Sequence, residues 1–78
     1  MSNVLYPAPR TYSYNFACDV VEKLFNPNYF VDLADPYKDS PITPKYLNEY
    51  VTYFYVGGEL VAMYDETSGD LWTTVNPN

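Results

Sequence analysis

A glycine pair between two apolar runs is the feature that most constrains how this 78-residue chain folds. Residues 50–56 (YVTYFYV) are β-branched or aromatic throughout, which favours a strand, and the apolar run Glu59–Asp65 (ELVAMYD) follows directly after Gly57 and Gly58. Two glycines adopt the positive φ angles of a two-residue turn without steric cost. The stretch therefore predicts an antiparallel hairpin.

The pairing expected across this turn places Tyr55 opposite Leu60 and Phe54 opposite Val61. Both faces of the hairpin are apolar, so we expect a helix to cover at least one of them. Phe54 is expected to lie in the core, and Tyr53 and Tyr55 are expected on the other face.

The N-terminal third of the chain predicts a strand followed by an amphipathic helix. Residues 4–9 (VLYPAP) predict a short buried strand, and residues 15–25 predict a helix with Ser13 as its N-cap and Asn26-Pro27 as its end. The apolar stripe expected on this helix consists of Phe16, Ala17, Val20, Val21 and Leu24. An ion pair is expected between Asp19 and Lys23.

The remaining segments predict shorter elements. Residues 29–33 predict a second strand, and the proline-rich residues 35–44 predict a loop. Thr43 followed by Pro44 is typical of a helix start, so a short helix is expected from Pro44 to residue 49. The β-branched residues at 71–75 predict a short edge strand. No repeat is visible, and residues 1–78 are expected to form a single domain.

The charge balance excludes several classes of function. Ten acidic residues against four basic ones give a net charge of −6, and the chain contains no histidine. Phosphate backbones repel such a protein, so direct binding of nucleic acid is not expected, whereas a basic protein surface attracts it. With Cys18 as the one cysteine, neither a zinc site nor a histidine-dependent triad can form within the chain.

The hydropathy pattern and the tyrosine content narrow the expectation further. No apolar run reaches the length of a membrane span, and no secretory signal is visible, so we expect a cytoplasmic protein with no membrane partner. With no histidine and one cysteine, we also expect no metal or other cofactor. Ten of the residues are tyrosines, a residue type that is enriched at protein interfaces. The composition therefore favours a protein with a tyrosine-rich contact surface.

Residues 4–24, 29–49 and 52–65 resemble, in this order, three parts of the glutaredoxin branch of the thioredoxin fold. These parts are the first strand with the active-site turn and first helix, the second strand and helix, and the final hairpin. The resemblance implies a small α/β domain of β-α-β-α-β-β order, with a mixed sheet that ends in an antiparallel hairpin. The alternative is an α+β domain in which a three-stranded antiparallel meander packs on one or two helices.

The catalytic groups of that family are missing from this chain. The family's cysteine-containing turn falls on residues 11–14 (TYSY), whose hydroxyls cannot replace the thiolate that thiol–disulfide exchange needs. The cis-proline position falls near residues 52–53 and the glycine pair at residues 62–63, so a glutathione site is not implied either. Cys18 lies inside the predicted helix. We therefore expect no enzyme activity.

These observations predict a non-catalytic, acidic module that binds another protein with a basic surface. It would act as an inhibitor or adaptor of a host protein, of the kind that a phage encodes, and would mask a basic or nucleic-acid-binding site. The expected contact residues are Tyr12, Tyr14, Asp35, Tyr37, Asp39 and Tyr46. Two alternatives stay open. One is a glutaredoxin-like redox protein that uses Cys18 or another non-standard thiol, and the other is a structural homodimer that pairs through the strand at residues 71–75.

Overall fold

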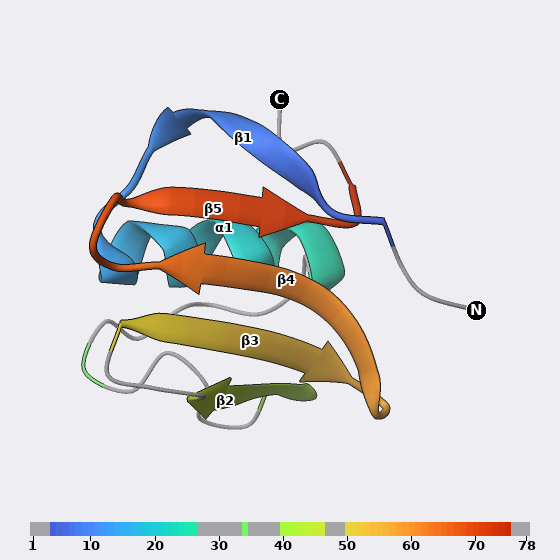
Figure 1. Ribbon diagram of the computed structural model, residues 1–78. Helices are drawn as coiled ribbons and strands as arrows, with labels where there is room; N and C mark the ends of the chain where they lie inside the picture. Colours follow the sequence, from blue (N-terminus) through green and yellow to red (C-terminus); the bar gives the residue numbers. More distant parts are fainter. Residues whose placement is uncertain (1–3, 27–33, 35–39, 47–49, 76–78) are drawn as a thin grey trace.

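The computed structural model describes residues 4–26, 34, 40–46 and 50–75, which form a five-stranded sheet with one helix on one of its faces (Figure 1). The elements follow in the order β1 (Tyr6–Thr11), α1 (Tyr14–Phe25), β2 (Ile42–Tyr46), β3 (Val51–Val56), β4 (Glu59–Asp65) and β5 (Asp70–Thr73). Their order in the sheet is β1-β5-β4-β3-β2, and every neighbouring pair is antiparallel. The chain thus crosses from one edge of the sheet to the other between β1 and β2, and returns strand by strand.

The predicted thioredoxin-like fold is therefore wrong. In a β-α-β-α-β-β domain the first two strands lie parallel in a mixed sheet, whereas here β1 pairs with β5 and all pairs are antiparallel. The described residues contain one helix, and the strand expected at residues 29–33 lies outside them. The alternative of a three-stranded meander also falls short, because β1 and β2 extend the sheet to five strands.

Helix α1 begins and ends as expected, and Ala17 and Val21 of the predicted stripe are buried, but the rest of the buried face differs. The Ser13 hydroxyl accepts a hydrogen bond from the Phe16 N–H, and Asp19 pairs with Lys23 at 3.1 Å. Phe16, expected in the apolar stripe, is 63% exposed, whereas Cys18 is fully buried. The buried face is made of Ala17, Cys18, Val21 and Glu22. This stripe is narrower than the predicted one, and it is less apolar because it includes Glu22. Its small side chains let the helix approach the sheet closely.

Both edge strands contain proline, which corrects two predictions. The segment expected to be a helix from Pro44 is strand β2, which pairs with β3 along its whole length. Pro7 and Pro9 lie within the edge strand β1, which is mostly exposed and not buried as predicted. Proline lacks the N–H of a ladder hydrogen bond, so it is tolerated at the edge of a sheet and blocks the addition of a further strand.

Strand β5 forms where a strand was expected at residues 71–75, but it is not an edge strand. It lies between β1 and β4 and pairs with both of them. The proposed homodimer contact through a free edge of this strand is therefore not available, since both of its sides are occupied.

The central hairpin forms as predicted, with one change in register. Gly57 and Gly58 adopt φ angles of 59° and 83°, and Tyr55 pairs with Leu60. Phe54 pairs with Ala62 instead of Val61, because the register shifts at this point and Val61 becomes the extra residue of a bulge. The Val61 carbonyl accepts a hydrogen bond from Thr74 N–H at 3.0 Å, which satisfies the bulged backbone.

The core lies between α1 and one face of the sheet. Its fully or almost fully buried apolar residues are Ala17, Cys18, Val21, Ile42, Phe54, Ala62, Tyr64 and Leu71. Along β3 to β5 these residues alternate with half-buried ones, so each strand turns one set of side chains to the helix and the other set away from it.

Glu22 is a carboxyl group within this core. The Ser40 hydroxyl donates a 2.9 Å hydrogen bond to Glu22 Oε2, and the same Ser40 oxygen accepts one from Ile42 N–H at 3.1 Å. The chain of bonds ties α1 to the start of β2. The other carboxyl oxygen, Oε1, is buried without a partner. Burial raises the pKa of Glu22, and the Ser40 hydrogen bond opposes this shift.

Replacing Phe54 by alanine should lower the free energy of unfolding by about 3–5 kcal/mol, because the fully buried ring leaves a cavity beside α1. Tyr53→Ala, on the other face of the same strand, is the control and should cost clearly less. Urea unfolding followed by circular dichroism measures both. Equal costs for the two variants would mean that the faces of β3 are wrongly assigned.

Glu22→Gln should stabilise the protein at neutral pH, because it removes a charge that is costly to bury. A raised pKa means that the folded protein keeps a proton that the unfolded chain has already released, so the Glu22 contribution to stability falls as pH rises from about 4.5 through the folded pKa. Thermal unfolding should therefore show little difference between variant and parent near pH 4, and a gain of a few degrees for the variant near pH 8. Glu59→Gln, at an exposed site, is the control. A variant that is less stable than the parent near pH 8 would contradict this account.

Candidate functional site

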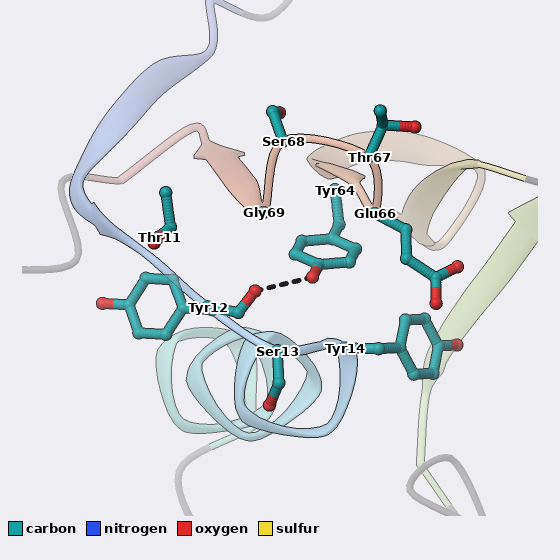
Figure 2. A pocket seen from close by; sticks show the side chains of 9 residues that line it. All are labelled: Thr11, Tyr12, Ser13, Tyr14, Tyr64, Glu66, Thr67, Ser68 and Gly69. Atoms are coloured by element: carbon teal, nitrogen blue, oxygen red, sulfur yellow. Dashed lines mark hydrogen bonds between the residues drawn. The ribbon is translucent and has the colours of Figure 1, made fainter.

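The turn between β1 and α1 lines an open hollow of about 530 Å³, which Figure 2 shows from close by. Its walls come from this turn, from β4 and from the turn between β4 and β5. The lining residues are Thr11, Tyr12, Ser13, Tyr14, Tyr64, Glu66, Thr67, Ser68 and Gly69. Residues 11–14 of the segment "RTYSY" therefore form one wall of this hollow.

The backbone of Tyr12 holds this hollow together. The Tyr64 hydroxyl donates a 2.6 Å hydrogen bond to the Tyr12 carbonyl (Figure 2), and Tyr12 N–H donates to the Gly69 carbonyl at 2.8 Å. Gly69 has a φ angle of 78°, and a Cβ atom there would lie 3.1 Å from the Tyr12 carbonyl oxygen. Glycine is thus favoured at this turn both by its backbone conformation and by the close approach of the Tyr12 backbone.

Four tyrosines meet here, and we call Tyr12, Tyr14, Tyr46 and Tyr64 the tyrosine junction. The Tyr14 ring contacts the Tyr64 ring edge-on, with centroids 5.9 Å apart, and its hydroxyl lies 2.7 Å from that of Tyr46 on β2. Burial, followed by the Tyr46 hydrogen bond, raises the pKa of Tyr14 far above its ordinary range, and burial likewise raises the pKa of Tyr64. Both phenols keep their protons at physiological pH, so they cannot serve as general bases.

The chemistry that the junction can perform is limited. The Ser13 hydroxyl caps α1, and the Tyr64 hydroxyl is bonded to the backbone of Tyr12, so neither is held by a base as a nucleophile would be. Cys18 is fully buried in α1, so the structure gives no support to a redox site at this thiol. No group of three or more potential metal ligands occurs among the residues that the structure describes. We interpret the junction as a structural contact that fastens β1 and α1 to β2, β4 and β5.

The predicted contact residues are only partly brought together. Tyr14 and Tyr46, which are 32 positions apart in the sequence, share a hydrogen bond. The Tyr12 ring points away from the Tyr14 ring in Figure 2, and the Arg10 guanidinium lies 6.0 Å from its centre. Asp35, Tyr37 and Asp39 lie outside the described residues. A role of these six residues in partner binding stays a prediction.

A second candidate surface is the face of the sheet that α1 does not cover, which we call the uncovered face with respect to the described residues. Figure 1 views the sheet from this side, with α1 behind it and no described element in front of it. One row of cross-strand neighbours spans all five strands on this face, and we call it the central row. It consists of Pro7, Trp72, Met63, Tyr53 and Lys45.

The central row carries large apolar side chains that remain half-buried. Trp72, Met63 and Tyr53 pair directly across β5, β4 and β3, and none of them belongs to the core against α1. Tyr55 and Leu60 pair on the same face, toward the Gly57-Gly58 turn. A sheet face of this kind in a single copy of a small domain remains in contact with water, which is the condition of an interaction surface.

Sequence reasoning did not identify this face. The predicted pairing of Phe54 with Val61 would have put Met63 on the Phe54 face, and the register shift at Val61 places Met63 beside Tyr53 on the other face. The signal that was missed is the alternation in β5, where Asp70 and Trp72 share one face and Leu71 the other. An edge strand at that position would have left Trp72 at a margin, whereas the actual order places it beside Met63.

Tyr64→Phe should lower the free energy of unfolding by about 1–2 kcal/mol, because it leaves the Tyr12 carbonyl without the hydrogen bond it receives. Tyr6→Phe is the matched control, since Tyr6 is 51% exposed on the edge strand β1 and lies outside the junction. Thermal unfolding compares the two. A loss for Tyr64→Phe no greater than that for Tyr6→Phe would show that the junction bond does not stabilise the fold.

Comparison of the chain with protein-family models, with curated proteins and with solved structures finds no significant match. No helix among the described residues is both long and apolar enough to cross a membrane. The site must therefore be interpreted from its own geometry and charge.

Proposed function

We propose that this protein is a non-catalytic module that binds another protein through the uncovered face of its sheet. The observation that carries the proposal is the central row, in which Trp72, Met63 and Tyr53 lie side by side and half-buried across three neighbouring strands. Tryptophan, tyrosine and methionine are enriched at protein interfaces, and aromatic residues near the centre of an interface contribute most of its binding energy.

The surrounding structure supports binding over catalysis. In the tyrosine junction, the hydroxyls of Tyr14, Tyr46 and Tyr64 and the backbone of Tyr12 are used in internal hydrogen bonds. The net charge of −6 favours a partner with a basic surface and increases the rate of encounter with it. An inhibitor or adaptor acting on such a partner in the cytoplasm, as a phage-encoded protein would, is the role that this proposal includes.

Site-specific photo-crosslinking tests the proposal directly. A photoreactive phenylalanine analogue replaces Trp72 or Tyr53 on the uncovered face, and replaces Lys23 on the outer side of α1 as the control. In lysate of the natural cells, positions 72 and 53 should give an adduct with one and the same protein, and position 23 should not. A further probe at Tyr12 examines the predicted site at the turn.

Two results would contradict the proposal. Adducts that form from position 12 but not from positions 53 and 72 would assign binding to the turn instead of the sheet. Equal adducts from position 23 and from the uncovered face would show nonspecific contact. Once a partner is known, Trp72→Ala should weaken its binding by at least about tenfold, as the loss of a central aromatic residue does.

A further inference from the structure

We infer that the partner covers this face with a cationic segment, whose apolar side chains lie on Trp72 and Met63 and whose lysine or arginine head groups reach Asp65 and Asp70. The inference rests on the proposed function, and it specifies the chemistry of the partner at the same surface. It follows from which residues are neighbours on β4 and β5.

An acidic pair adjoins the apolar pair on the same face. Met63 is directly opposite Trp72, and the next pair on the same side of these two strands is Asp65 opposite Asp70. Residues two apart along a strand lie on the same face, so the four side chains form a compact block that is apolar at one end and anionic at the other. Glu66, at the adjoining turn, lines the hollow beside Tyr14 and Tyr64 and lies outside this block.

No residue that the structure describes neutralises the charges of this block. Among the described residues, the ion pair that forms is Asp19 with Lys23 on α1, so no described base pairs with Asp65, Glu66 or Asp70. Like charges directly opposite each other destabilise an antiparallel pair. Asp65 Oδ1 accepts hydrogen bonds from Thr67 N–H at 2.9 Å and from Ser68 N–H at 3.4 Å, which orients this carboxylate without removing its charge.

Lysine and arginine side chains complement such a block, because each has an aliphatic stem for the apolar end and a charged group for the anionic end. Their aliphatic stems pack on apolar surface while the charged end stays solvated or paired, and a cation over the face of tryptophan gains a further attraction. Lys45 lies at the opposite end of the central row, on β2, and it would repel a second cation. The cationic part of the partner is therefore placed over β4 and β5.

Other occupants fit this face less well. A second copy of the chain brings another net charge of −6, and anionic phosphates are repelled in the same way. An added strand at the β2 edge meets Pro44, which has no N–H, and Ile42, whose N–H is already donated to Ser40. The edge at β1 contains Pro7 and Pro9. The face of the sheet, and not its edge, is thus the surface that a partner can use.

The test uses the fluorescence of Trp72, which is the single tryptophan of the chain. Short blocked peptides of alternating leucine and lysine, of leucine and glutamate, and of serine and lysine serve as probes. The leucine–lysine peptide should shift the Trp72 emission to shorter wavelength in a saturable manner, and the other two should not. Equal saturation with the serine–lysine peptide would overturn the apolar part of the inference.

Charge variants test the acidic part. Asp65→Asn with Asp70→Asn should weaken binding of the leucine–lysine peptide by about tenfold at low salt, as two partly exposed ion pairs do. Asparagine at position 65 keeps the oxygen that accepts the turn hydrogen bonds, so the fold is preserved. The matched control is Asp19→Asn with Glu59→Gln, which removes the same charge from other surfaces and should change binding less than twofold. Equal losses in both double variants would overturn the inference.

The remaining outcomes separate this inference from the proposed function. Sedimentation that shows a dimer formed through Trp72 in the absence of peptide would replace the cationic partner by a second copy and would overturn the inference. If crosslinking from position 72 identifies a partner whose affinity is the same in the Asp65→Asn, Asp70→Asn variant and in the parent, the proposed function stands and the inference fails. If the uncovered face gives no specific adduct, the proposed function itself fails.

Discussion

The packing of α1 against one face of the sheet is the contact on which the rest of the structure depends. Ala17, Cys18 and Val21 are small, so the helix lies against Phe54 and Ala62 without a further layer between them. One described helix covers one face of five strands, and the opposite face is left with side chains as large as Trp72. The uncovered face is thus a direct consequence of how the core is built. In this protein the division between the core and the proposed binding surface follows the alternation of residues along each strand.

Turns and helix caps could be predicted from the sequence, because a few adjacent residues determine their structure. The Gly57-Gly58 turn and the Ser13 cap formed as predicted because each depends on a few adjacent residues. The Thr43-Pro44 pair misled the prediction, since the same dipeptide suits a helix start and an edge strand, and pairing with β3 decided between them. The position of β5 between β1 and β4 is set by contacts across nearly the whole chain, which no local pattern contains. The tyrosine junction was not predicted. Tyr12, Tyr14 and Tyr46 were named as contact residues for a partner, and the bonds that join them to one another and to Tyr64 connect distant parts of the chain.

Glu22 and the pair Asp65 and Asp70 both lower the stability of the fold. Glu22 does so through burial of a charge, and the pair through repulsion of like charges. Glu22 lies in the core with one oxygen unpartnered, and its bonds through Ser40 to Ile42 join the helix to an edge strand. Asp65 and Asp70 face each other at the surface, where water screens their repulsion. A domain of this size has only a small margin of stability, so such costs are a large fraction of the total. The first cost accompanies a connection within the fold, whereas the second lies on the surface that we propose as a binding face.

The pairing of β1 with β5 has a consequence for how the molecule is made. Tyr6 lies opposite Thr73, so two segments from opposite ends of the described chain must meet before the sheet is complete. During synthesis β1 leaves the ribosome first, and its partner strand does not yet exist when the central hairpin is formed. The hydrogen bond from the Tyr12 N–H to the Gly69 carbonyl likewise cannot form until Gly69 has been translated. Contacts of such long sequence separation form slowly, so the nascent protein completes its sheet, and with it the surface around Trp72, only after β5 has been translated.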